Sequence, residues 1–191
     1  MSEDEIYEIT FLGRGGQGAV TAAQILAQAA ISKGLYALAN PEFGPERRGA
    51  PVRAYLRVSR NPIETREPIV EPNILLVMHP DLLSYFRDLI NRTRDYLVVN
   101  AKDGSFVDKV RELFDGTIVY LDAYAIAMKY LGRPIVNTAM IGGLLRVLDI
   151  VTLEDVEAVI SENFSSEKIA KLNIEALREA YRAARVVSNG G

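Results

Sequence analysis

Cysteine is absent from this sequence of 191 residues, and histidine occurs only once. Without a thiol the chain can form no disulfide, bind no iron–sulfur cluster through thiolates and offer no cysteine nucleophile. The one histidine, His79, has no second metal ligand evident beside it in the sequence, and a cap or loop contact is favoured over proton transfer. Any chemistry that needs thiols must therefore come from another chain.

The sequence also lacks long apolar runs and an excess of positive charge. No uninterrupted apolar stretch approaches the ~18 residues of a membrane span, and the acidic start MSEDEIYE lacks the apolar core of a signal peptide. A formal net charge of −3 supplies no basic field for a nucleic-acid backbone. We therefore expect a cytoplasmic protein that binds neither membranes nor nucleic acids.

What is present is an ordinary globular composition, 49% hydrophobic and 25% charged, which predicts a single domain over residues 1–191. Apolar runs bounded by turn residues predict strands at 6–12, 35–39, 52–58, 73–78, 96–99 and 117–121. Apolar residues at helical spacing predict helices at 17–33, 80–90, 122–131, 137–149, 153–163 and 166–187. The predicted fold is α/β: a Rossmann-like, mostly parallel sheet flanked by helices, with a helical C-terminal third.

Several single positions carry local predictions. The strand 52–58 alternates apolar with polar residues, so Arg53 and Arg57 should lie on a solvent-exposed face together with Arg60. Asp122 is placed to cap the helix that follows it. The segment 40–49 should be irregular, because proline and glycine punctuate it.

Asn137 is likewise placed to cap its helix. Two adjacent glycines in the same helix, Gly142 and Gly143, indicate a close backbone approach to another element.

Residues 13–18, GRGGQG, join the first strand to the first helix. Gly13, Gly15 and Gly18 have the G-x-G-x-x-G spacing that brings bare amides close to a diphosphate at a helix N-terminus. Arg14 adds a cation there. The spacing alone is equally compatible with a tight structural turn. A dinucleotide site would need an acidic residue about 20 positions later, where this chain has Ala39 and Asn40, so NAD is disfavoured.

A second loop, FGPERRG at 43–49, places Arg47 and Arg48 between helix-breaking residues. Planar guanidinium groups on such a loop suit the capture of carboxylate or phosphate. The alternative is that Glu46 pairs with one arginine at a solvated surface.

GRGGQGAVTAAQILAQAA, NPEFGPERRGAPVRAYLRVS and VNTAMIGGL together resemble the gamma subunit of the 2-oxoacid:ferredoxin oxidoreductases, of the pyruvate synthase type. The resemblance covers nearly the whole chain. It implies a subunit of an enzyme that oxidatively decarboxylates a 2-oxoacid, transfers the acyl group to coenzyme A and reduces ferredoxin. It also implies alpha, beta and delta-type partner subunits, which carry the thiamine diphosphate, magnesium and iron–sulfur clusters.

The resemblance gives the gamma subunit no catalytic or metal-binding residue of its own and a contact with coenzyme A. Gly13, Gly15, Gly16, Gln17 and Gly18 match the first motif of the family, while Arg14 falls in a variable position. In the second motif Gly44, Pro45, Glu46, Arg48 and Gly49 match, and Arg47 is variable. The expected ligand-binding set is Gly13, Arg14, Gly15, Gly16, Gln17, Gly18, Arg47 and Arg48, with Gln17 donating a hydrogen bond to a diphosphate.

Two alternatives remain open at this point. A branch of the family that acts on 2-oxoisovalerate, 2-oxoglutarate or indolepyruvate would look similar, because the keto-acid pocket lies mainly on other subunits. A stand-alone module that binds coenzyme A or a nucleotide would share the glycine loop without a redox partner.

Overall fold

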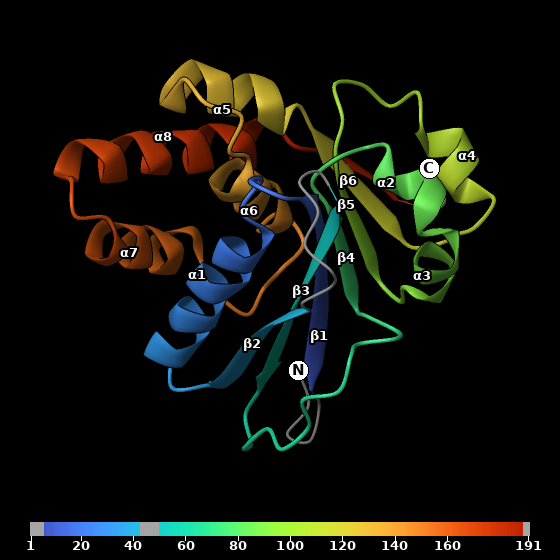
Figure 1. The fold of residues 1–191 in the computed structure, drawn as a ribbon, viewed down its shortest axis with the longest axis horizontal. Coiled ribbons are helices and arrows are strands. Elements are labelled where there is room, and N and C mark those ends of the chain that lie inside the picture. The colour runs from blue at the N-terminus through green and yellow to red at the C-terminus, as the bar shows by residue number, and fades with distance from the viewer. Residues whose placement is uncertain (1–5, 43–49, 189–191) are drawn as a thin grey trace.

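A computed structural model describes residues 6–42 and 50–188, and in this part of the chain seven strands form one sheet. The strands lie in the order β2-β3-β1-β4-β5-β6-β7 (Figure 1). The pairs β1–β4, β4–β5 and β5–β6 are parallel. Strands β3 and β7 run antiparallel to the other five strands. Their bounds are β1 Tyr7–Arg14, β2 Tyr36–Glu42, β3 Pro51–Ser59, β4 Ile74–Val77, β5 Tyr96–Asn100, β6 Thr117–Leu121 and β7 Arg185–Val187.

Helices cover both faces of this sheet (Figure 1). One layer contains α1 Ala19–Ser32, α5 Ala123–Leu131, α6 Asn137–Leu144, α7 Leu153–Asn163 and α8 Glu167–Ala183. The other layer contains the short helices α2 Leu82–Tyr85, α3 Arg87–Arg92 and α4 Val107–Arg111. The predicted α/β class and mostly parallel sheet are confirmed.

The alternation of side chains along the central strands divides the core in two. Ile74 and Leu76 of β4 pack into the larger cluster with α1, α6 and α8, whereas Leu75 and Val77 pack into the smaller cluster with α2 and α4. All four side chains are fully buried. A strand covered on both faces needs apolar residues at every position, which is why these strands read as continuous apolar runs.

Helix α6 lies inside the larger layer, and each of its eight residues is buried. A Cβ on Gly142 would lie 2.4 Å from the carbonyl oxygen of Leu177 in α8, and one on Gly143 would lie 2.6 Å from Leu121 Cδ2 in β6. The predicted close approach is therefore confirmed, and it occurs within this chain. Asn137 does not cap the helix: it is the first helical residue, and the N-cap position belongs to Val136.

Several predicted boundaries were wrong. The last helix ends at Ala183, and Arg185–Val187 then pairs antiparallel with β6 as an edge strand. The predicted helix at 137–149 ends at Leu144, and the one at 80–90 is divided between α2 and α3. Residues 40–42, predicted to be irregular, extend strand β2 to Glu42, and Pro41 is tolerated there because β2 is an edge strand.

The prediction that Arg57 faces solvent was also wrong. Its side chain is only 4% exposed, and its Nε donates to Glu8 Oε1 at 2.9 Å. Glu8 and Arg57 are direct neighbours across β1 and β3, so the opposite charges meet in the sheet register. Arg60, after the end of β3, is exposed as expected.

Candidate functional site

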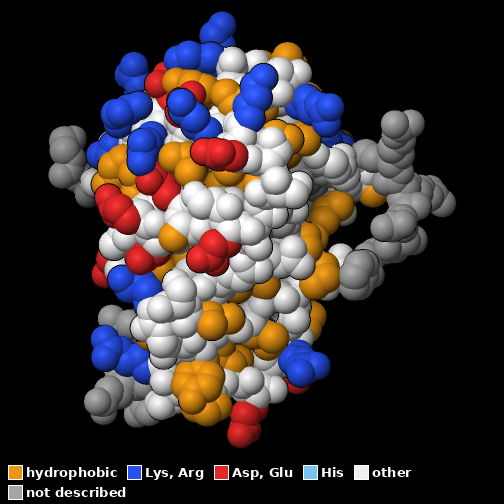
Figure 2. Space-filling model, turned by 90° about the vertical axis from the view of Figure 1, so that its left-hand side faces the viewer, with side chains coloured by type: hydrophobic (Ala, Val, Ile, Leu, Met, Phe, Trp, Pro, Cys, Tyr) orange, Lys and Arg blue, Asp and Glu red, His pale blue; other side chains and the backbone are white. Residues whose placement is uncertain are grey.

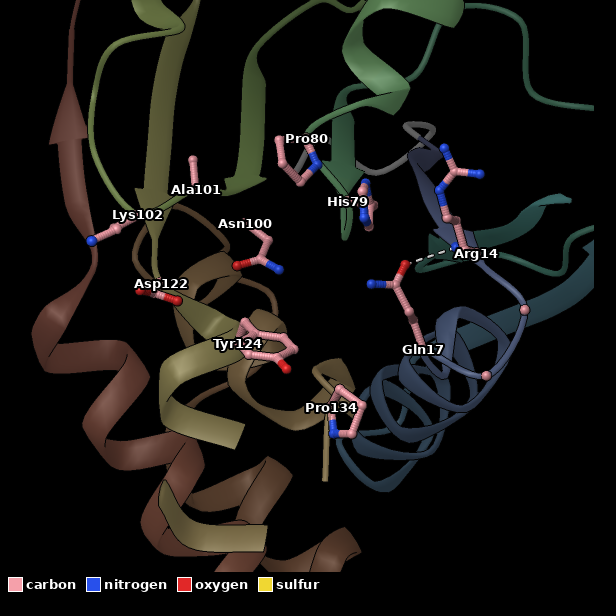
Figure 3. A pocket seen from close by; sticks show the side chains of 12 residues that line it. Arg14, Gln17, His79, Pro80, Asn100, Ala101, Lys102, Asp122, Tyr124 and Pro134 are labelled. Carbon is pink, nitrogen blue, oxygen red and sulfur yellow. Dashed lines mark hydrogen bonds between the residues drawn. The ribbon is translucent and has the colours of Figure 1, made fainter. Parts of the chain in front are cut away.

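A cavity of about 560 Å³ opens at the carboxyl ends of the parallel strands. We call it the loop cavity (Figure 3). In the sheet, β2 and β3 lie on one side of β1 and β4 lies on the other side of β1, so the strand order reverses its direction at β1. Open α/β sheets bind ligands at such a switch point. The cavity is lined by Arg14, Gly15, Gly16, Gln17, His79, Pro80, Asn100, Ala101, Lys102, Asp122, Tyr124 and Pro134.

The glycine loop forms one wall of this cavity. Gln17 N donates to Arg14 O at 3.1 Å and closes a turn between β1 and α1. Gly16 and Gly18 have φ values of 93° and 84°, which favour glycine over any residue with a side chain. A Cβ on Gly18 would also lie within 3.0 Å of the Asn137 side chain. The turn and the packing explain these two glycines. Of the predicted loop residues, Arg14, Gly15, Gly16 and Gln17 line the cavity, whereas Gly13 and Gly18 are not among its lining residues.

The Gln17 side chain braces the loop against the sheet. Its Oε1 accepts from Arg14 N at 2.8 Å, and its Nε2 donates to Met78 O at 3.2 Å. One of its two amide N–H groups is therefore engaged inside the protein. This brace holds the end of β1 beside the end of β4.

Asn100, which the sequence does not single out, connects Met78 to the start of α5. Its Nδ2 donates to Met78 O at 2.9 Å, and its Oδ1 accepts from Ala123 N at 2.9 Å at the start of α5. The residue is buried. A polar residue directly after a continuous apolar strand was the signal that could have found it.

Charged groups surround the cavity mouth. Arg14 Nη2 lies 3.8 Å from Asp81 Oδ2, and His79 Nδ1 lies 3.5 Å from the same carboxylate oxygen. His79 thus lies in the connection after β4 and contacts a loop carboxylate, as predicted.

Asp122 Oδ1 accepts from Ala125 N at 2.9 Å, which confirms it as the cap of α5. Lys102 is exposed on the β5–α4 side of the mouth.

The arrangement suits an anion with an apolar portion. Arg14 and Lys102 supply positive charge, and helix α1 begins at Ala19 directly behind the loop, with no acidic residue in its first turn. Tyr124, 53% exposed, and Pro134 supply apolar surface on the opposite wall. Among the described residues, no cluster of three or more His, Cys, Asp or Glu side chains could hold a metal ion.

The second predicted cluster cannot be placed in this cavity. Arg47 and Arg48 lie in 43–49, outside the residues that the structure describes, as do Gly44, Pro45, Glu46 and Gly49. The arginine loop therefore stays a prediction. In the described ranges, no helix has both the length and the apolar character needed to cross a membrane.

Comparison with known proteins decides the family. Residues 8–183 match the family model described as pyruvate ferredoxin/flavodoxin oxidoreductase. The chain belongs to this family. Its relatives include the common gamma subunit of the pyruvate/ketoisovalerate oxidoreductases of Pyrococcus abyssi, 40% identical over 181 residues, or 94% of this chain and 97% of the relative.

Solved structures agree with the assignment to the pyruvate ferredoxin/flavodoxin oxidoreductase family. Pyruvate oxidoreductase subunit PORC of Thermotoga maritima superposes with a TM-score of 0.85 at 34% identity and covers 97% of this chain and 100% of its own. The predicted gamma-type subunit of this family's oxidoreductases is thereby confirmed.

A more distant structure shares only the fold. The 2-oxoglutarate:ferredoxin oxidoreductase of Magnetococcus marinus, solved with 2-oxoglutarate, coenzyme A and succinyl-CoA, has a TM-score of 0.78 at 18% identity. The match covers 95% of this chain and 31% of that one.

Proposed function

We propose that this chain is the gamma subunit of a cytoplasmic pyruvate:ferredoxin oxidoreductase and that its loop cavity binds the phosphate-bearing part of coenzyme A. The observation that carries the proposal is the loop cavity itself, which combines a braced glycine loop with Arg14 and Lys102 at a strand-order switch point. The choice of ligand is motivated by the family and by an enzyme with the same fold that was solved with coenzyme A.

The size of the loop cavity limits what this chain can hold. At about 30 Å³ for each water-sized group, 560 Å³ corresponds to about 19 non-hydrogen atoms. Coenzyme A is considerably larger, so a partner subunit must contact the rest of it, including the thiol. Alpha, beta and delta-type subunits would supply the thiamine diphosphate, magnesium and iron–sulfur clusters and deliver electrons to ferredoxin. The absence of cysteine from this chain fits that division, because thiolates ligate such clusters.

A second substrate class is favoured by the relatives. The gamma subunit of Pyrococcus abyssi is named as common to a pyruvate and a ketoisovalerate enzyme. One gamma chain can serve both when the keto-acid pocket is on other subunits, and the same arrangement would suit this chain.

The test is a kinetic comparison in the assembled complex purified with its partners. Arg14→Ala and Lys102→Ala should each raise the KM for coenzyme A about tenfold or more, since each removes a charged hydrogen-bond donor, and should leave the KM for pyruvate unchanged. Arg60→Ala, an exposed arginine after β3, is the matched control. An unchanged coenzyme A KM in both variants, with the complex intact, would refute the assignment of the loop cavity.

A further inference from the structure

A separate cavity of about 420 Å³ lies between the start of α1, the α5–α6 connection and the α7–α8 turn. We call it the α8 cavity. It shares the segment 133–135 with the loop cavity, because Pro134 lines the loop cavity, whereas Arg133 and Ile135 line the α8 cavity. Its volume lies in the range of small-molecule sites. The proposed coenzyme A function does not use it.

The walls of the α8 cavity are mostly apolar. Phe164 closes one end, and Ile169 and Leu172 contribute from successive turns of α8, opposite Leu131 and Ile135. Ile169 remains 48% exposed, although it belongs to a helix whose other large apolar residues are more buried. Covering this surface would remove apolar area from water, which favours a ligand with a hydrocarbon portion.

Asn137 lines the α8 cavity and has an amide donor that no described residue uses. Asn137 is only 6% exposed, and its Oδ1 accepts from Thr138 N at 2.8 Å. Because a backbone N–H can only donate, this bond fixes Oδ1 toward the helix and leaves Nδ2 as the free donor, beside Gly18 at the start of α1. Within the described part of the chain, Nδ2 has no hydrogen-bond acceptor. A free amide N–H on the wall of a cavity favours a ligand that brings an acceptor.

One charged side chain lines the α8 cavity. Arg133 is the one ionisable residue among those that line it, and no carboxylate pairs with Arg133 in the described ranges. Lys168 and Lys171 are exposed on α8 beside the lining residues Ile169 and Leu172. Figure 2 shows many Lys and Arg side chains, with some Asp and Glu among them, at the upper end of this side of the molecule, where α5 and α8 lie in Figure 1. Glu162 and Glu167 are also exposed near the lining residues, so it is Arg133 in the lining that offers a partner to an anionic group.

We propose that the α8 cavity binds a small monocarboxylate with an apolar chain. Its hydrocarbon part lies against Leu131, Phe164 and Leu172, and its carboxylate accepts hydrogen bonds from Arg133 and Asn137 Nδ2. At about 30 Å³ each, a volume of 420 Å³ corresponds to about 14 water-sized groups. Acids of about four to ten carbons fit this volume.

The experiment is a calorimetric titration of the full chain, and of the assembled complex, with straight-chain carboxylates from butanoate to decanoate. Affinity should rise about threefold to fourfold for each added methylene until the cavity is filled. The primary alcohols of the same length should bind at least tenfold more weakly, because they lack the charge. Arg133→Ala should weaken the acids to the level of the alcohols and leave alcohol binding unchanged.

Two further variants test whether the acids bind in the α8 cavity itself. Ile169→Trp, at a half-exposed position where folding is not at risk, should abolish binding of the longer acids by narrowing the mouth. Arg60→Ala should change nothing. Neither Arg133 nor Ile169 lines the loop cavity, so coenzyme A kinetics should be normal in both variants, and failure of one proposal does not entail failure of the other.

Three results would overturn the inference. The first is acid binding that does not depend on chain length. The second is full binding in Arg133→Ala and Ile169→Trp, which would place the acids elsewhere. The third is acid binding to the isolated chain that disappears in the assembled complex, which would show that a partner subunit fills the α8 cavity.

Discussion

Gln17 and Asn100 donate hydrogen bonds to the same backbone carbonyl, that of Met78, at 3.2 and 2.9 Å. Gln17 belongs to the loop after β1, Met78 follows β4, and Asn100 ends β5. The other amide atom of each side chain extends the connection, to Arg14 N and to Ala123 N respectively. One line of side-chain hydrogen bonds thus joins the glycine loop to the start of α5 and forms the floor of the loop cavity.

The shared carbonyl predicts that the two side chains are energetically coupled. Asn100→Ala should lower the free energy of unfolding by about 1–3 kcal/mol, because it leaves the buried Ala123 N–H unsatisfied, and Gln17→Ala should have a smaller effect. Each single variant leaves Met78 O with one donor, but the double variant leaves none. The double variant should therefore cost more than the sum of the two, as measured by urea unfolding. Additive effects would show that the shared carbonyl does not couple them.

Gly16 and Gly18 should respond differently to alanine. Both have positive φ, which costs about 1–2 kcal/mol for an alanine. A Cβ on Gly16 meets no atom of the described residues within 4 Å, whereas one on Gly18 meets the buried Asn137 side chain. Gly18→Ala should thus destabilise by an additional 1–3 kcal/mol or so from overpacking. Thermal unfolding of the two variants checks the order, and equal losses would mean that Asn137 moves aside freely.

Replacing only one partner of the Arg57–Glu8 ion pair should lower the free energy of unfolding. Among the described residues, Arg57→Leu leaves the Glu8 carboxylate, whose side chain is 20% exposed, with only the distant Arg94 at 4.0 Å. We expect a loss of about 3–5 kcal/mol in chemical unfolding, and recovery of most of it in the double variant Glu8→Leu with Arg57→Leu. A double variant as unstable as the single one would contradict this account.

The cap of α7 should make stability depend on pH. Burial raises the pKa of Asp155, but hydrogen bonds from Thr152 and Lys33 outweigh this effect, so the pKa lies below its usual value. A carboxylate with a lowered pKa stabilises the fold above its unfolded pKa of about 3.9, and that contribution is lost as the pH falls through the folded value. Asp155→Asn should remove this acid-dependent part of stability. Urea midpoints measured from neutral pH down to about pH 3 would reveal it, and identical pH profiles would refute it.

The sequence predicted the sheet and the place of the glycine loop because both depend on local pattern. Strands β4, β5 and β6 are covered on both faces, so continuous apolar runs in the sequence predicted them. Asp122 was predicted as a helix cap because a capping side chain bonds a backbone N–H only three residues away. Contacts between distant residues were not predictable. The burial of Arg57 depends on Glu8, 49 positions away, and the anchoring of Gln17 depends on Met78, 61 positions away.

The C-terminal strand was missed for a related reason. Residues 185–187 continue the apolar spacing of α8, and only pairing with the free edge of β6 makes them a strand.

The most direct test of the central claim is an NMR titration of the chain, labelled with ¹⁵N-glycine, with coenzyme A. If phosphates bind at the loop cavity, the amide signals of Gly15 and Gly16 should shift in a saturable way, while those of Gly34 and Gly132 should stay fixed. Like Gly16, these two controls have positive φ, but neither is among the residues that line the cavity. Inorganic pyrophosphate should shift the same loop signals, and Arg14→Ala should weaken both effects. Unmoved Gly15 and Gly16 signals at saturating coenzyme A would contradict the account.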